Sequence, residues 1–490
     1  MTTLPLHERR LPLSITEAAR LLRARETSAA ELADIARVRA HTDRFNAWLR
    51  IEDEHARTQA KAADERLRRG DAPLLTGIPW ACKDIIGTKG IETTAGSKIL
   101  EGYVPPYSAT VVERLDAEGA VMVGKTNLDE FAMGSSNENS AFGAVKNPWC
   151  VDRVPGGSSG GSAVAVAAGE ALFALGTDTG GSIRQPAALT GVVGMKPTYG
   201  RVSRYGVVAF ASSLDQVGPF ANSVEDCAIV CEALFGKDAN DATTMPLPTE
   251  DLRRELDRGV KGMRIGVPKE FFVSGMEQGV EQAVRDALRE LERQGAELVD
   301  VSLSLTDHGL AVYYLIQPAE ASANLARYDG VRYGLRVEGP DLVETYRRTR
   351  GKGFGPEVKR RMILGTYALS AGYYDAYYVK AQKVRTLIKQ EFDRVFETVD
   401  AIVTPTSPTV AFKIGQKVDD PLSMYLNDIF TLPVNISGLP GISLPCGLSD
   451  GLPVGLQVIA NSFQEATMFR VAAAYERSTK HHELRPVAAA

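Results

Sequence analysis

Two glycine- and serine-rich segments in the middle of the chain each place a serine where it could take part in acyl transfer. Residues 156–162 read Gly-Gly-Ser-Ser-Gly-Gly-Ser and precede an apolar run whose composition predicts a helix. Glycines at a helix N-terminus let backbone N–H groups approach a ligand, and the helix dipole favours negative charge there. A flexible linker is the alternative interpretation, but the apolar, structured flanks argue against it.

The second segment, residues 176–186, follows the apolar strand-like run Leu172–Leu175 and contains Ser182 directly after two glycines. A serine at this place is expected to be exposed at the end of a strand. Successive N–H groups around it could form an oxyanion hole for an acyl-transfer intermediate. An ordinary glycine-rich turn is the alternative, and it is weakened by the presence of two such segments.

A serine nucleophile needs a base, and the usual candidate, histidine, is absent from residues 56–307. A distant histidine could fold back, because such triads are not local in sequence. Lysine is the remaining base, and Lys83 ends the apolar run Ile78–Cys82. Burial lowers the pKa of a lysine, and only the neutral amine accepts a proton. Alone, Lys83 could equally be a surface lysine whose stem covers apolar residues.

Two other motif matches do not fit their structural context. Residues 119–126 fit the phosphate-loop pattern formally, but the spacer 120–123 is itself an apolar strand and a helix precedes it. Residues 157–161 fit the nucleophile-elbow pattern, which would make Ser159 the nucleophile and leave His308 as the only non-terminal histidine partner. Neither nucleotide binding nor a histidine triad is favoured, and no Cys/His spacing suggests zinc.

The bulk composition is that of a globular protein and excludes several classes. A net charge of −5 gives no basic face of the kind that holds nucleic acid. The five scattered cysteines do not form a disulfide framework. The N-terminal stretch lacks the apolar segment of a signal peptide, and no apolar run is long enough to span a bilayer. We expect a soluble, cytoplasmic protein without a membrane segment.

The elements that position these motifs follow from the hydrophobic pattern. Apolar residues at helical spacing predict a helical lead-in over residues 14–70, with Ser14 and Ser28 as N-caps. From Ile78 onward, short strands alternate with helices, which predicts an α/β domain. The predicted strands are 80–82, 121–123, 172–175, 192–195, 263–267 and 400–403, and the predicted helices are 110–118, 162–168, 281–293 and 374–397.

The order and spacing of Lys83, residues 156–162 and residues 179–186 resemble the amidase signature family. The resemblance implies that Lys83 is the base, Ser158 the relay and Ser182 the acyl-forming nucleophile. It also implies a cis peptide bond between Gly157 and Ser158. The backbone N–H groups that it assigns to the oxyanion hole are those of Thr179, Gly180 and Gly181.

The fold implied is α/β, with a mixed central β-sheet covered by α-helices on both sides. All of residues 1–490 would form one amidase domain. Within it, residues 14–70 would be the lead-in, 75–250 the catalytic core, and 251–480 the remainder of the sheet together with the helices of the substrate pocket.

A narrower resemblance covers nearly the whole chain. Residues 129–139, 357–361 and 425–428 are similar to the A subunits of tRNA-dependent amidotransferases, which release ammonia from glutamine. The resemblance implies that Arg361 pairs with the α-carboxylate of glutamine, a task that suits its fork of donors. Asp428 would pair with the α-ammonium group, and Tyr313 would line the pocket. The alternatives are a surface ion pair for the first two residues and core packing for the tyrosine.

The same resemblance implies partners. In such a heterotrimeric ligase of protein biosynthesis, the B subunit uses ATP and Mg²⁺ to activate misacylated Glu-tRNA(Gln), or Asp-tRNA(Asn), and adds the ammonia. The small C subunit braces the pair. This chain would then carry no cofactor or metal, and the tRNA would be held mainly by the B subunit. A stand-alone amidase and a catalytically inactive scaffold are the rival hypotheses; a hydrophobic amide substrate would need neither Arg361 nor Asp428.

Overall fold

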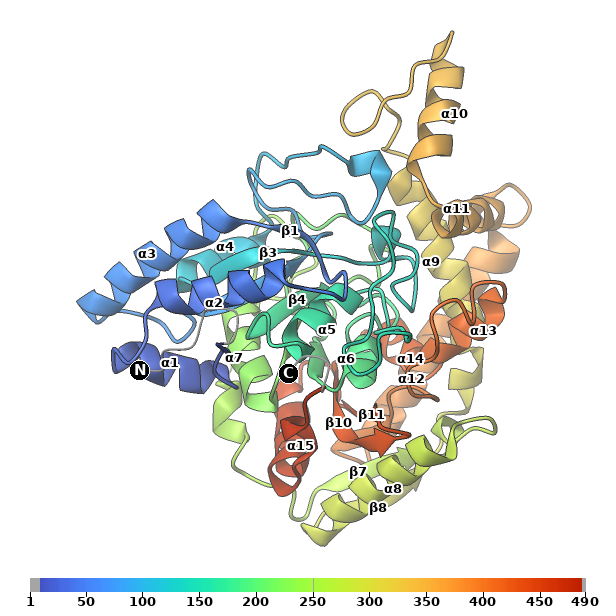
Figure 1. Ribbon diagram of the computed structural model, residues 1–490. Helices are drawn as coiled ribbons and strands as arrows, with labels where there is room; N and C mark the ends of the chain where they lie inside the picture. Colours follow the sequence, from blue (N-terminus) through green and yellow to red (C-terminus); the bar gives the residue numbers. More distant parts are fainter. Residues whose placement is uncertain (1–8, 250, 487–490) are drawn as a thin grey trace.

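The computed structural model describes residues 9–249 and 251–486, and one mixed sheet runs through this part of the chain (Figure 1). Its eleven strands lie in the order β1-β3-β2-β4-β6-β5-β10-β11-β9-β7-β8. The strands are β1 Trp48–Ile51, β2 Pro79–Lys83, β3 Val121–Thr126, β4 Phe173–Thr177, β5 Val193–Lys196, β6 Val217–Ala221, β7 Arg264–Pro268, β8 Glu297–Val301, β9 Ala401–Pro405, β10 Gly441–Ser449 and β11 Leu452–Ile459.

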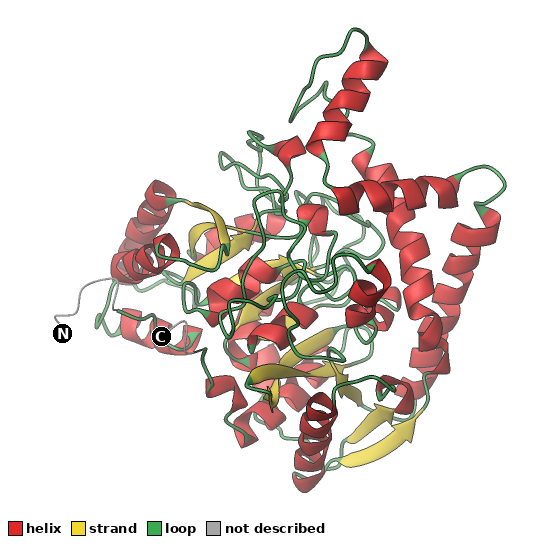
Figure 2. Cartoon of the chain, turned by 45° about the vertical axis from the view of Figure 1, so that its right-hand side comes forward, coloured by secondary structure: helices red, strands yellow, loops and turns green. Residues whose placement is uncertain are grey.

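Helices surround the sheet, as Figure 2 shows in red against the yellow strands. They are α1 Ile15–Arg23, α2 Ala29–His41, α3 Asp53–Arg69, α4 Thr110–Glu118, α5 Gly160–Ala167, α6 Arg184–Thr190, α7 Val224–Leu234, α8 Gln278–Arg293, α9 Gly309–Leu325, α10 Leu342–Gly353, α11 Pro356–Leu369, α12 Lys380–Phe396, α13 Pro421–Tyr425, α14 Leu432–Ile436 and α15 Glu465–Ser478.

Consecutive residues of β5 show that helices cover both faces of the sheet. A Cβ atom at Gly194 would meet the side chain of Ala187 in α6. The next residue, Met195, contacts Cys231 of α7 through its sulfur atom at 3.5 Å. Neighbouring strand residues point to opposite faces, so α6 and α7 pack on opposite sides. The expected α/β class, with a mixed sheet between helical layers, is confirmed.

The N-terminal lead-in is helical, as predicted, with one exception. Ser14 and Ser28 are the N-caps of α1 and α2, and their hydroxyls accept hydrogen bonds from the N–H groups of Glu17 and Glu31 at 3.1 Å each. The exception is β1, which was not predicted and which pairs antiparallel with β3 at the edge of the sheet. A four-residue edge strand is too short for its periodicity to stand out between two strongly helical segments.

The predicted strands and helices of the core occur at the predicted places, with ends that differ by a few residues. The region 374–397 differs in detail, because residues 375–379 form a π-helical turn before α12 begins. The spacer of the formal phosphate-loop match lies in β3 and follows α4, so the chain there does not have a phosphate-loop geometry. No helix in the described part of the chain is both long and apolar enough to cross a membrane.

The sheet brings Lys83 and the Gly/Ser segment that begins near Thr177 to the same end of two neighbouring strands. Strands β2 and β4 are parallel neighbours, so Lys83 and Thr177 both lie at the carboxyl ends of their strands. The helices α9, α11 and α12 lie beside this region, with α10 projecting beyond them (Figure 1). Helix α9 supplies Tyr313 and α11 supplies Arg361, whereas Asp428 lies in the 3-10 turn Leu426–Asp428 that follows α13.

Candidate active site

The side chain of Lys83 is enclosed by hydroxyl groups. The residue is fully buried, and its Nζ donates to Ser158 Oγ at 2.9 Å, Ser159 Oγ at 2.7 Å and Thr177 Oγ1 at 2.8 Å. No carboxylate of the described residues forms a salt bridge with it. Three hydroxyls can accept hydrogen bonds from the three N–H groups of an ammonium, but they supply no opposite charge.

This environment gives Lys83 the protonation behaviour of a base. Burial lowers its pKa from 10.5 to about 7, because the charged form loses its hydration. Asp129, Asp178 and Asp215 act in the opposite direction, but their charges do not offset the burial. A substantial fraction of the amine is therefore neutral near pH 7 and able to accept a proton through Ser158.

The two candidate serines come together through the backbone. The peptide bond between Gly157 and Ser158 is cis, as the resemblance implied. The N–H of Ser159 donates to the carbonyl oxygen of Ser182 at 3.3 Å, which joins the two serine-rich segments. Ser158 is fully buried, and Ser182 is 7% exposed. Of the two, Ser182 is thus the serine that a substrate can reach.

A buried aspartate holds the loop that carries Ser182. Asp178 accepts a hydrogen bond from the N–H of Gly181 at 2.8 Å, and Arg184 Nε and Asn435 Nδ2 donate to it at 3.0 and 2.8 Å. Burial alone would raise the pKa of Asp178, but the Arg184 guanidinium overcomes this and lowers it to about 2. The carboxylate is therefore charged and fixes the turn between β4 and α6.

The backbone N–H groups that were predicted to form an oxyanion hole differ in their contacts. The N–H of Gly181 is taken by Asp178, so it does not point freely toward a ligand. The N–H groups of Thr179, Gly180 and Ser182 have no acceptor among the described residues. Two of the three predicted donors are thus available, and the N–H of Ser182 itself is a third.

Arg361 lies inside the protein on the inner face of α11. It is 2% exposed, and its Nε donates to Glu357 Oε1 at 2.8 Å while its Nη1 donates to Gln317 Oε1 at 3.2 Å. The rings of Tyr314 and Tyr425 lie 5.4 and 5.5 Å from its guanidinium carbon. The alternative of a surface ion pair is excluded by this burial. Its Nη2 has no partner among the described residues.

Asp428 is also buried, and its two carboxylate oxygens differ in their contacts. Ser135 Oγ donates to Oδ2, whereas Oδ1 accepts no hydrogen bond in the described part of the chain. Burial raises the pKa of Asp428 to about 7. A Cβ atom at Gly181 would come within 3.4 Å of Oδ1, so this oxygen lies beside the loop of Ser182.

Tyr313 reaches the same loop from α9. A Cβ atom at Gly180 would meet its ring carbon and hydroxyl at 2.7 Å, so the ring lies against the loop. Burial raises the pKa of Tyr313, so its hydroxyl stays protonated. The structure therefore brings Ser182, Asp428 and Tyr313 together around one short loop.

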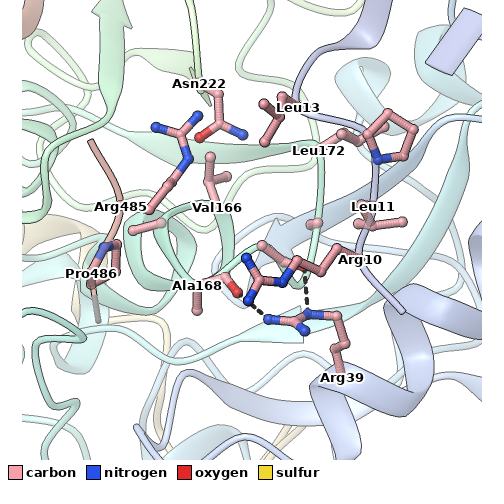
Figure 3. Close-up of a pocket in the computed structure, with 14 residues that line it drawn as sticks. Arg10, Leu11, Leu13, Arg39, Val166, Ala168, Leu172, Asn222, Arg485 and Pro486 are labelled. Atoms are coloured by element: carbon pink, nitrogen blue, oxygen red, sulfur yellow. Dashed lines mark hydrogen bonds between the residues drawn. The ribbon is translucent and has the colours of Figure 1, made fainter. Parts of the chain in front are cut away.

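A cavity of about 230 Å³ opens next to Arg361. It is lined by Glu357, Arg360, Tyr425 and Lys417, among others. A separate pocket (Figure 3) lies where α2 and α5 meet the N- and C-terminal segments, and it shares no residue with this site. Within residues 9–249 and 251–486, no group of three or more His, Cys, Asp or Glu residues could hold a metal ion.

Four contact residues of the site were not predicted from the sequence: Ser159 and Thr177 as partners of Lys83, Ser135 as the partner of Asp428, and Gln317 as a partner of Arg361. Ser159 and Thr177 lie in the two serine- and glycine-rich segments, and their hydroxyls were the available signal. Ser135 lies in the segment 129–139 that carries the narrower resemblance, which was its available signal, whereas Gln317 gave none, because an isolated polar residue in a helix has many possible roles.

Comparison with known proteins shows which family this chain belongs to. The family model described as Amidase matches residues 32–469. The A subunit of glutamyl-tRNA(Gln) amidotransferase from Chloroflexus aggregans is 59% identical over 477 residues, covering 97% of this chain and 98% of the relative. A crystal structure of the corresponding A subunit from Thermotoga maritima is 45% identical and superposes with a TM-score of 0.81, covering 98% of this chain and 96% of that one. The peptide amidase from Stenotrophomonas maltophilia is 32% identical with a TM-score of 0.82, and covers 95% and 97% of the two chains.

Proposed function

The chain belongs to the amidase family, and from this premise we propose that it hydrolyses glutamine and supplies the ammonia for a tRNA-dependent amide transfer. The observation that carries the proposal is the burial of two charged groups: Arg361, which is ion-paired with Glu357, and Asp428, an incompletely paired carboxylate beside the loop of Ser182. An α-amino acid amide offers the two opposite charges that these groups would bind. A purely apolar amide offers neither.

The proposed reaction begins with proton transfer from Ser182. Its Oγ attacks the side-chain amide carbon of glutamine, while its proton passes to Ser158 and the proton of Ser158 passes to the neutral amine of Lys83. The negative charge on the amide oxygen is stabilised by the free N–H groups of Thr179, Gly180 and Ser182.

Collapse of this intermediate breaks the C–N bond. Ser158 gives its proton to the leaving nitrogen and takes one back from Lys83, so that ammonia departs, the amine is again neutral and an acyl ester remains on Ser182. Water then attacks the ester with the same proton path, which releases glutamate and restores the serine. Arg361 would bind the α-carboxylate, Asp428 the α-ammonium group, and Tyr313 would pack against the substrate chain.

We further propose that this chain acts in a heterotrimer with B and C subunits. The relative from Chloroflexus aggregans is named as the A subunit of a glutamyl-tRNA(Gln) amidotransferase, which supports an assembly in which ammonia is used elsewhere. ATP, Mg²⁺ and the misacylated tRNA, Glu-tRNA(Gln) or Asp-tRNA(Asn), would bind mainly to the B subunit. The charge of −5 on this chain agrees with a protein that does not itself grip tRNA.

Substrate choice tests the proposal. The purified chain, alone and with the two partner subunits, is assayed for release of glutamate from glutamine and for hydrolysis of aryl and alkyl amides. We expect glutamine to be the preferred substrate. Rapid turnover of apolar amides with none of glutamine would instead make the chain a stand-alone amidase.

A further inference from the structure

Gln317 lies at the centre of helix α9 and contacts Arg361. The residue is fully buried, and its Oε1 accepts a hydrogen bond from Arg361 Nη1 at 3.2 Å. Its other amide atom, Nε2, has no hydrogen-bond partner among the described residues. An amide nitrogen that is buried without an acceptor costs about 1–3 kcal/mol, so this atom calls for an explanation.

The orientation of the amide is fixed by hydrogen-bond chemistry. A guanidinium group only donates, so the atom of Gln317 that faces Arg361 must be the carbonyl oxygen. Turning the amide over would place two donors against each other. The Nε2 group therefore points away from Arg361, where the described residues supply no acceptor for it.

Helix packing determines where this donor lies. A Cβ atom at Gly365, one turn after Arg361 on α11, would overlap the carbonyl oxygen of Pro318. The backbones of α9 and α11 are thus in close contact at Pro318, and this contact brings Gln317 beside Arg361. Tyr313 lies one turn before Gln317 on the same face of α9 and reaches Gly180.

The spacing along α9 fits the length of the proposed substrate. The four-residue step from Tyr313 to Gln317 rises about 6 Å along the helix, which is comparable to the roughly 5 Å between the amide carbon and the carboxylate carbon of extended glutamine. A substrate whose amide lies at the Ser182 loop beside Tyr313 would therefore place its carboxylate near Gln317.

We propose that Gln317 is a substrate-binding residue whose Nε2 donates a hydrogen bond to the α-carboxylate of glutamine, next to Arg361. This role rests on the proposed glutaminase function. The carboxylate supplies the acceptor that Nε2 lacks among the described residues. Gln317 thus both orients Arg361 through its oxygen and binds the substrate through its nitrogen.

Two variants of the full chain separate these two roles. Gln317→Glu keeps an acceptor for Arg361, whose positive charge holds the new carboxylate ionised, but it replaces the donor with a negative oxygen. Gln317→Met removes both the acceptor and the donor at similar volume. A residue that only holds Arg361 predicts that the Glu variant behaves like the wild type.

We expect instead that Gln317→Glu is impaired, and more strongly than Gln317→Met. KM for glutamine should rise by about 10- to 100-fold in Gln317→Glu, because a hydrogen bond to a charged group is lost and repulsion is added. The rise should be smaller in Gln317→Met, and kcat should change less than KM in both. Thermal unfolding of each variant, followed by circular dichroism, establishes that the protein is folded.

The decisive experiment compares two substrate analogues. One is 4-aminobutanamide, which is glutamine without its α-carboxylate, and the other is glutaramate, which lacks only the α-amino group. The loss of kcat/KM in Gln317→Glu should persist with glutaramate and disappear with 4-aminobutanamide. An equal loss with both analogues, or an unchanged KM for glutamine in folded Gln317→Glu, would overturn the role of Gln317. A wild-type chain that does not hydrolyse glutamine in the assembled complex would overturn the proposed function, and this role with it.

Discussion

The pH dependence of glutamine hydrolysis tests the assignment of Lys83 as the base. With a pKa of about 7, the amine is protonated below neutral pH and free to accept a proton above it. The turnover number, kcat, should therefore rise with pH and level off above a midpoint near 7. At pH 7.5 about three quarters of such an amine is neutral, against about one part in a thousand for a lysine of ordinary pKa. Burial thus increases the active fraction by a factor on the order of 10³.

The assay measures initial rates of glutamate release at saturating glutamine from about pH 5.5 to 9, a range that brackets the expected midpoint. Saturation matters because Asp428, with a pKa of about 7, must be ionised to bind the α-ammonium group and so affects KM in the same range. A pair of variants at Thr177, whose hydroxyl accepts from Lys83 Nζ at 2.8 Å, provides the control. Thr177→Val removes an acceptor that stabilises the ammonium form and should shift the midpoint down by about one unit. Thr177→Ser keeps the hydroxyl and should leave the midpoint in place.

Two results would refute this reasoning. A kcat that is constant from about pH 6 to 9 would mean that no group with a pKa near 7 controls the chemistry. A midpoint that moves upward in Thr177→Val would mean that the titrating group is not the amine that this hydroxyl contacts.

Three further outcomes follow from the same contacts. Ser182→Ala should abolish glutamine-dependent amide transfer in the assembled complex but spare transfer from added ammonium salt; equal loss of both activities would make the serine structural. Asp428→Asn should raise KM for glutamine at least about tenfold near pH 8 and remove the pH dependence of KM near neutrality, whereas an unchanged KM profile would rule out its pairing with the α-ammonium group. Gly365→Ala should lower stability by about 1–3 kcal/mol in denaturant unfolding, since its Cβ would overlap the carbonyl of Pro318. Gly351→Ala, at a helical glycine with no atom within 4 Å of the added Cβ, is the matched control and should leave stability unchanged or slightly higher.

The sequence predicted the elements that carry strong local signals. Apolar runs bounded by glycine indicated the core strands, and serine caps indicated the starts of α1 and α2. The absence of histidine around the Gly/Ser segments favoured a lysine base, and the resemblance to the amidase signature family then selected Lys83. Local pattern could not give the order of strands in the sheet, because a pairing such as that of Lys196 in β5 with Gly441 in β10 joins residues far apart in the chain.

In the candidate site, too, local sequence predicts some features, whereas others depend on contacts between distant segments. Gly/Ser segments mark where Ser158 and Ser182 lie, but the contact of the Thr177 hydroxyl with Lys83 depends on the parallel pairing of β2 with β4. The hydrogen bond from the Gly181 N–H to Asp178 could not be predicted from the sequence either. A turn sequence does not state which of its N–H groups a neighbouring carboxylate will take, because that depends on how the surrounding side chains hold the carboxylate.

The distribution of unsatisfied polar atoms explains why the pocket of Arg361 should select its ligand by charge. Folding normally pairs buried polar groups, and the buried Asp178 is paired with Arg184 and Asn435. Asp428 Oδ1 and Gln317 Nε2 are among the buried polar atoms that have no partner in the described residues, and these two belong to the candidate site. An amide without an α-carboxylate or α-ammonium group would leave these atoms unpaired when bound, and each such loss costs about 1–3 kcal/mol. Together the two atoms therefore disfavour a simple aliphatic amide by roughly 30-fold to more than 10,000-fold relative to glutamine, without any steric exclusion of the smaller molecule.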